Sequence, residues 1–130
     1  MFTTIGILTY YDNPYKLAVG IDDEIGRYYR SLIPKYFNVR KPLYSSHVSV
    51  IRKEVPQVLG TWRKFHGEKV PIHYDNFIYN DELYFWLNAF SPQLEKIRRE
   101  LGLSNLSEYT KSPDGQHRFH ITIANTKHHL

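Results

Sequence analysis

A four-residue pattern that occurs twice constrains this chain more than any other feature. His47-Val48-Ser49-Val50 and His120-Ile121-Thr122-Ile123 each contain a histidine, an apolar β-former, a hydroxyl residue and a second apolar β-former. Because successive side chains of a strand point to opposite faces, each copy predicts a strand with the histidine and the hydroxyl on one face. A single copy is typical of a half-buried strand whose polar face meets water. Only two of the seven histidines carry the pattern, which favours one site built from both strands.

Composition limits the class of protein. At 130 residues, with 42% hydrophobic and 15% aromatic residues, the chain is large enough for one domain with a folded core. The formal charge of +4 favours an anionic partner. The absence of cysteine excludes disulfides, a thiol nucleophile and cysteine-ligated zinc, and it favours the cytoplasm. No stretch approaches the ~18 apolar residues of a membrane span, and residues 1–11 lack the features of a signal peptide. We expect a soluble cytoplasmic protein with no obligate protein partner.

Hydrophobic periodicity and turn residues predict most of the regular elements. The expected strands cover residues 5–11, 47–52, 69–79, 82–89 and 119–123, and the expected helices cover residues 21–32 and 92–101. Asp22 or Asp23 can cap the first helix, Ser91 can cap the second and Gly102 can end it. Residues 69–79 and 82–89 suggest an antiparallel hairpin. Residues 55–65 fit either a short helix or an irregular loop, and residues 112–115 read as an exposed turn.

The order of these elements predicts an α+β fold with mainly antiparallel sheets. A helix, a polar connection and a histidine strand follow one another twice along the chain. We therefore expect residues 1–130 to form a single domain of two pseudo-symmetric lobes, with the sheets lining a central cleft and the helices outside. In this arrangement His47 and His120 lie on opposite sides of a bound phosphate.

The paired motifs, their separation and the expected bilobal order resemble the two-histidine (2H) phosphoesterases. That superfamily includes RNA 2′,3′-cyclic phosphodiesterases of the LigT type and small phage enzymes that degrade cyclic oligonucleotide signals of bacterial CBASS immunity. The resemblance implies a phosphoric diester hydrolase in which His47 and His120 are catalytic and Ser49 and Thr122 hold the phosphate. The segment of residues 41–52 looks closer to the phage anti-CBASS members. The implied setting is the cytoplasm of a bacterial or infected host cell.

The chemistry also follows from the residue types. The pKa of histidine lies near 6.5, so one imidazole can act as base while a protonated partner acts as acid. One histidine takes the proton of a ribose 2′-hydroxyl and the other protonates the departing 5′-oxygen, which yields a 2′,3′-cyclic phosphate. Ser49 and Thr122 can donate hydrogen bonds to the non-bridging oxygens. The sequence leaves open which of His47 and His120 is the acid. No metal or other cofactor is expected.

Further residues are candidates for substrate binding around these four. The residues considered for substrate binding are Tyr10, Tyr11, Lys41, Arg52 and Trp86, with Lys127 as a further cation. An outward-facing Trp86 or a tyrosine at the end of the first strand would suit a nucleobase. The alternative for the two tyrosines is that at least one of them belongs to the core. Most surface lysines and arginines are only solvated.

Two questions stay open from the sequence. The substrate is either a cyclic oligonucleotide, which we place first, or an RNA or nucleotide with a 2′,3′-cyclic phosphate. Rival classes are a metal-dependent hydrolase around His73-Tyr74-Asp75, a non-catalytic RNA-binding module and a protein that binds a cyclic nucleotide without cleaving it. His128-His129 is either a tail or a weak metal-binding pair.

Overall fold

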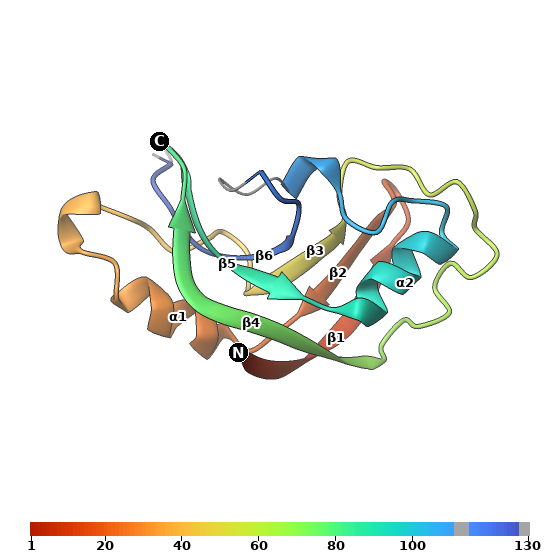
Figure 1. Ribbon diagram of the computed structural model, residues 1–130, viewed down its shortest axis with the longest axis horizontal. Coiled ribbons are helices and arrows are strands. Elements are labelled where there is room, and N and C mark those ends of the chain that lie inside the picture. The colour runs from red at the N-terminus through yellow and green to blue at the C-terminus, as the bar shows by residue number, and fades with distance from the viewer. Residues whose placement is uncertain (111–114, 128–130) are drawn as a thin grey trace.

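Six antiparallel strands close into one barrel in the order β1-β2-β3-β6-β5-β4, as the computed structural model shows (Figure 1). The structure describes residues 1–110 and 115–127, so the expected turn at 112–115 and the pair His128-His129 lie partly or wholly outside the described residues. The strands are β1 (Phe2–Tyr11), β2 (Lys16–Gly20), β3 (His47–Ile51), β4 (Lys69–Asn80), β5 (Tyr84–Phe90) and β6 (Phe119–Asn125). All neighbours pair antiparallel.

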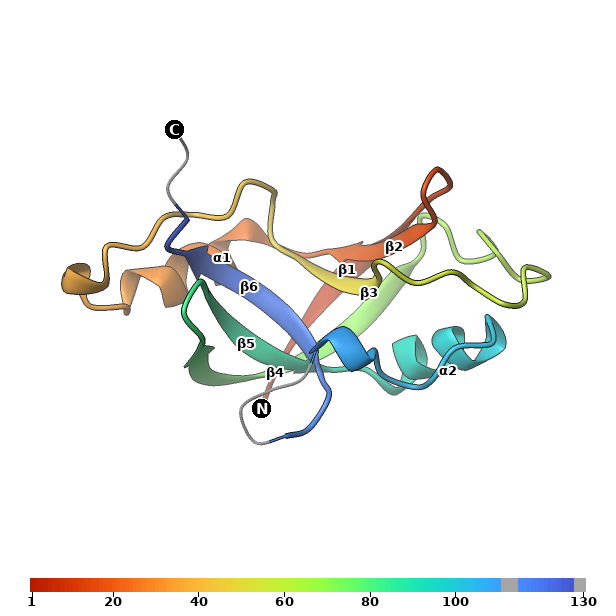
Figure 2. The same cartoon turned by 90° about the horizontal axis from the view of Figure 1, so that it is seen from above.

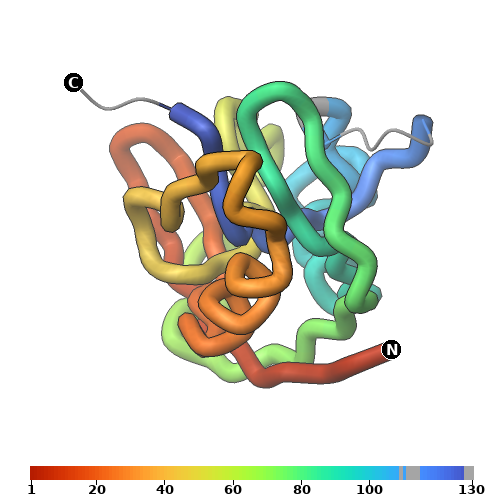
Figure 3. The backbone as a smooth tube through the Cα atoms, turned by 90° about the vertical axis from the view of Figure 1, so that its left-hand side faces the viewer, coloured from red at the N-terminus to blue at the C-terminus, as the bar shows by residue number. Residues whose placement is uncertain are grey.

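Two short helices close the ends of the barrel. Figure 2 shows α1 (Asp23–Ser31) at one end and α2 (Pro92–Glu100) at the other, and Figure 3 looks onto the end that α1 covers. The predicted caps are confirmed, because the Asp22 carboxylate accepts from the backbone N–H of Glu24 and the Ser91 hydroxyl accepts from that of Leu94. Gly102 follows α2 with a φ of 78°, which ends the helix. No helix in the described part of the chain is long and apolar enough to cross a membrane.

The predicted bilobal architecture is wrong. The expectation was an α+β fold of two lobes around a central cleft, but the strands form one continuous barrel. The physical reason is β2, a five-residue strand that the sequence pattern did not indicate. It joins β1 to β3, and the pairings of β3 with β6 and of β1 with β4 join the two halves of the chain into one ring. Residues 55–65 contain turns and no helix, and two 3₁₀ turns occupy Lys35–Phe37 and Glu108–Thr110.

The core lies inside the barrel and beneath the two helices. Alternate residues of each strand point inward, so Val48 and Val50 of β3 are buried together with Ile121 and Ile123 of β6. The helices add apolar side chains to the same cluster, among them Tyr29 of α1 and Leu94 and Ile97 of α2, and Leu101 at the C-cap of α2 joins them. This burial fixes which residues of β3 and β6 face outward.

A buried ion pair ties α2 to the end of β3. The Arg98 side chain is fully buried and its Nη1 and Nη2 atoms donate to the two carboxylate oxygens of Glu54, each at 2.8 Å. Nη1 also donates to the backbone carbonyl of Val50 and Nε donates to that of Ser104, both at 2.7 Å. Because the guanidinium N–H groups have acceptors, the buried charge is compensated.

Replacing Arg98 with methionine is expected to lower the free energy of unfolding by about 3–5 kcal/mol, because Glu54 would remain a partly buried carboxylate without its cation. Urea unfolding measures the change. The double variant Arg98→Met/Glu54→Leu serves as the control and should recover most of the loss, since an apolar pair can replace a buried ion pair. A loss below about 1 kcal/mol for Arg98→Met would show that the ion pair adds little.

Candidate active site

The two motif strands are direct neighbours. β3 and β6 pair antiparallel with Val48 opposite Ile121, and both of these side chains are completely buried. The residues on either side of each therefore face away from the core. All four polar motif residues are half-buried, which confirms the alternation that the sequence predicts: His47, Ser49, His120 and Thr122.

The register places these four residues in a crossed arrangement. One step from the Val48–Ile121 pair in either direction sets His47 opposite Thr122 and Ser49 opposite His120. Directly opposite residues have Cβ atoms about 5 Å apart, and diagonal neighbours about 7–8 Å. The histidines thus occupy one diagonal and the hydroxyls occupy the other. The expectation that His47 and His120 face each other across a cleft is wrong, because both lie on the outer wall of one barrel.

His47 is held by the loop that leads into β3. Its Nδ1 atom lies 2.8 Å from the carbonyl oxygen of Ser45, which accepts the Nδ1 proton and leaves Nε2 for chemistry. The backbone N–H of Ser46 donates to the carboxylate of Asp23 at 2.7 Å, and the carbonyl of Ser46 accepts from Ile21 at 3.1 Å. The first turn of α1 therefore anchors the loop that orients the histidine.

His120 is held by an aromatic stack. The Trp86 ring lies 4.9 Å from the His120 ring with an interplanar angle of 24°, and Tyr79 stacks on the far side of Trp86. Burial lowers the pKa of His120 to about 4; the Asp81 carboxylate opposes this shift and the Arg118 guanidinium adds to it. His120 is therefore neutral at pH 7.

Trp86 does not have the predicted role. Its side chain is only 5% exposed and it is sandwiched between Tyr79 and His120, so it supports the histidine and offers no open face to a nucleobase. Asn88 lies opposite His120 on β5 and is also buried. Asn88 was not among the site residues expected from the sequence. Its position between apolar residues of a strand is the signal that could have identified it.

The opposite flank of the site is open. On β2, Gly20 lies opposite His47 and Ala18 lies opposite Ser49. A Cβ atom built on Gly20 would meet nothing within 4 Å. A ligand can therefore approach His47 over Gly20 of β2. Sequence reasoning missed this feature because β2 itself was not expected.

A half-buried lysine between two tyrosines borders this open flank. The Lys16 ammonium lies 5.6 Å from the ring centroid of Tyr11 and 5.7 Å from that of Tyr44. The Tyr11 ring is half exposed, as a base-stacking role requires. The Tyr10 side chain, in contrast, is only 3% exposed and packs edge-on against Trp62 in the core. The interpretation of Tyr10 as a substrate-binding residue is wrong.

The remaining predicted cations are spread around the site. Lys41 lines a surface pocket of about 210 Å³ beside α1, together with Arg27 and Arg30. Arg52 is exposed directly after β3, and Lys127 lies over the Tyr84 ring at 4.8 Å. A second pocket of about 200 Å³ includes Arg118 and His117 near the start of β6. Both pockets lie beside the four motif residues rather than on them.

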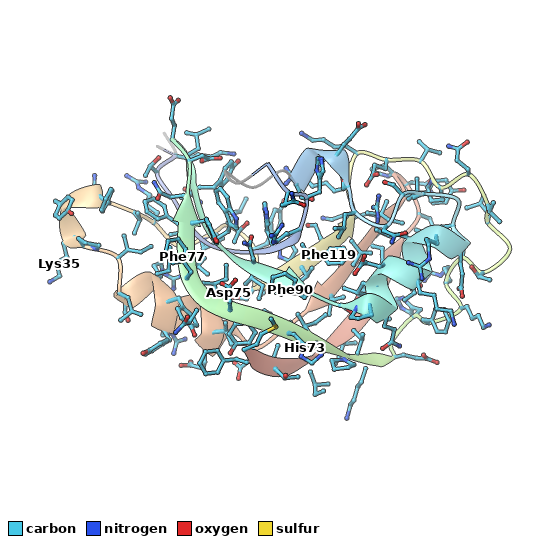
Figure 4. All side chains as sticks on the ribbon, viewed as in Figure 1. Lys35, His73, Asp75, Phe77, Phe90 and Phe119 are labelled. Atoms are coloured by element: carbon cyan, nitrogen blue, oxygen red, sulfur yellow. The ribbon has the colours of Figure 1, made fainter. Side chains whose placement is uncertain are left out.

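The candidate metal ligands on β4 have other surroundings. His73 Nδ1 lies 2.8 Å from the Thr3 hydroxyl, and Figure 4 labels His73 and Asp75 along the curved strand. Within residues 1–110 and 115–127, no group of three or more histidine, aspartate or glutamate side chains is placed to hold a metal ion.

Comparison with family models, curated proteins and solved structures finds no match to this chain. The chemistry of the site therefore rests on its geometry. Two imidazoles on one diagonal, one of them kept neutral by burial, and two hydroxyl donors on the other form a site suited to acid–base reactions of an anion.

The ring of His120 should titrate near pH 4 in the free protein, and Trp86→Leu should move its pKa upward toward 6.5 by exposing it. NMR of the imidazole carbons against pH measures both values. Because the folded pKa lies below the unfolded one, this burial contributes stability above pH 6.5 that is lost as the pH falls toward 4. Trp62→Leu, at the chain's other tryptophan, is the matched control and should leave His120 unchanged. An unchanged His120 pKa in Trp86→Leu would contradict the assignment.

Proposed function

We propose that this protein is a phosphodiesterase in which His47 and His120 act as an acid–base pair. The crossed arrangement of the four motif residues carries the proposal. In-line displacement at phosphorus places the attacking and leaving oxygens at opposite apices, with the non-bridging oxygens between them. A phosphate centred over the β3–β6 pair has a histidine toward each apex. Ser49 and Thr122 then lie beside the non-bridging oxygens, where negative charge grows.

The surroundings of the two rings divide their roles. His120 is neutral at pH 7, so it accepts the proton of a ribose 2′-hydroxyl. The role of acid then falls to His47, whose Nδ1 atom donates to the Ser45 carbonyl and whose Nε2 atom is left for proton transfer. The 2′-oxygen forms a bond to phosphorus as the bond to the 5′-oxygen breaks. His47 protonates that 5′-oxygen, and a 2′,3′-cyclic phosphate results.

The second step reverses the proton transfers. His47, now neutral, takes a proton from water, whose oxygen attacks the cyclic phosphate. His120, now protonated, returns its proton to the ribose oxygen that leaves. The site is then restored, with a phosphomonoester as product. Opening of 2′,3′-cyclic phosphates on RNA is thus a partial reaction of the same residues, and it is the alternative activity.

The substrate we place first is a cyclic oligonucleotide signal of the kind used in bacterial CBASS immunity, with the cytoplasm of a bacterial or infected host cell as the setting. The open flank over Gly20 admits a polymeric phosphodiester, and the exposed rings of Tyr11 and Tyr44 offer faces to bases. The proposal extends the motif resemblance to the two-histidine phosphoesterases. The proposal does not depend on the bilobal fold that the resemblance implied, because the strands form one closed barrel.

His47→Ala and His120→Ala should each lower kcat/KM by about 10²–10⁴-fold, because each removes a proton-transfer group. Ser49→Ala and Thr122→Val should each cost about 10²-fold or less. The assay is product analysis with a panel of cyclic oligonucleotides and 2′,3′-cyclic nucleotides in EDTA. His73→Ala, at a histidine outside the site, is the control.

Two results would contradict the catalytic proposal. Turnover that persists in both histidine variants would show that other groups perform the chemistry. Tight binding of a panel member without any product, in the wild-type protein, would favour the non-catalytic alternatives.

Gly20→Val should reduce kcat/KM by at least about tenfold while the melting temperature stays the same or rises. Valine favours strands and meets no neighbour at this position, so the fold tolerates it, but its methyl groups occupy the space beside His47. Kinetics and thermal unfolding are measured on the same sample. Full activity in this variant would mean that the substrate does not pass over β2.

A further inference from the structure

A cationic pocket adjoins the loop that holds His47. It has a volume of about 210 Å³ and lies between α1 and the segment that precedes β3. Its polar lining residues include Asp23, Arg27, Arg30, Lys41, Tyr44 and Ser46. Three cations thus face a single carboxylate. That carboxylate, on Asp23, already accepts the backbone N–H of Ser46, which leaves the pocket with an excess of positive charge.

The three cationic side chains of the pocket are placed where they can contact a bound anion. The Arg30 guanidinium is fixed to the barrel because Nη1 donates to the carbonyl of Ile123 at 2.9 Å. Arg27 forms an ion pair with Glu24 one helical turn earlier, and both side chains are more than 60% exposed. An exposed pair of this kind contributes little free energy, so an arriving anion can take the place of Glu24. Lys41 is exposed on the other wall.

The pocket adjoins the loop that leads to His47, and none of the four motif residues lines it. Ser46 lines it, and its neighbour Ser45 supplies the carbonyl that orients the His47 ring. The pocket is smaller than the about 300–1,000 Å³ of sites that enclose a whole drug-sized ligand. Its charge and size fit one phosphate group better than a complete nucleotide.

We propose that this pocket binds the phosphate adjacent to the one being cleaved in an oligonucleotide substrate. The inference rests on the proposed function and narrows it, because it makes the enzyme select substrates with two or more phosphates. One phosphate sits over the β3–β6 pair and the next is held by Arg27, Arg30 and Lys41. A mononucleotide 2′,3′-cyclic phosphate occupies only the first position and gains nothing from the pocket.

The test compares substrates with one and with two phosphates. The double variant Arg27→Gln/Lys41→Gln is assayed with 5′-phosphorylated diadenylate (pApA) and with 2′,3′-cyclic AMP. We expect its kcat/KM for pApA to fall about tenfold further than that for 2′,3′-cyclic AMP, as loss of charge-assisted contacts implies, with the effect in KM. Lys35→Gln is the matched control; Figure 4 shows Lys35 on the 3₁₀ turn beyond α1, away from the barrel.

A binding measurement separates this proposal from the catalytic one. The deoxy analogue pdApdA carries two phosphates but no 2′-hydroxyl, so the proposed reaction cannot cleave it. Calorimetric titration should show about tenfold weaker binding to the double variant than to the wild type or Lys35→Gln. Equal binding to all three proteins, or no binding to the wild type, overturns the phosphate pocket. Equal losses for both substrates in kinetics also overturn it. Absence of turnover in the wild type overturns the catalytic function instead, and the titration still decides the pocket.

Discussion

The pairing of β3 with β6 at Val48 and Ile121 is the constraint on which the site depends. Both side chains are completely buried, and the core beneath them is shared by strands from both halves of the chain. The side-chain period of a strand is two, so a slip of one residue would turn the histidines inward and the apolar residues outward. The hydrophobic core thus sets the positions of four polar groups that it does not contain.

Electrostatics then make two similar histidines unequal. Each precedes a hydroxyl residue by two positions, yet their rings meet different surroundings. The Nδ1 atom of the His47 ring lies against the backbone carbonyl of Ser45, whereas the His120 ring lies against the indole of Trp86, where desolvation lowers its pKa. Two similar sequence motifs therefore place their histidines in different surroundings. The difference comes from the Trp86 ring on β5, which stacks on His120, and from the backbone carbonyl of Ser45, which contacts His47.

The sequence predicted the elements better than their arrangement. The two histidine strands, both helix caps and the hairpin of β4 and β5 follow from local patterns, and each is found in the structure. Strand pairing depends on contacts between distant segments, which local patterns do not contain. The short β2, with alanine and glycine on its outer face, lacked a strand signature, and without it the barrel could not be inferred. Burial of Tyr10 and Trp86 likewise depends on neighbours from other strands.

The strand that carries His47 is fastened at both ends by different helices. Asp23 of α1 holds the loop before it, and Arg98 of α2 holds the carbonyl of Val50 near its end. Surface segments that make none of these bonds, such as the 3₁₀ turn at Lys35–Phe37, do not set the position of the strand. Those segments can therefore change in length and sequence over evolutionary time while His47 keeps its place in the barrel. Such a scaffold allows the surface around the histidine to diversify without moving the histidine itself.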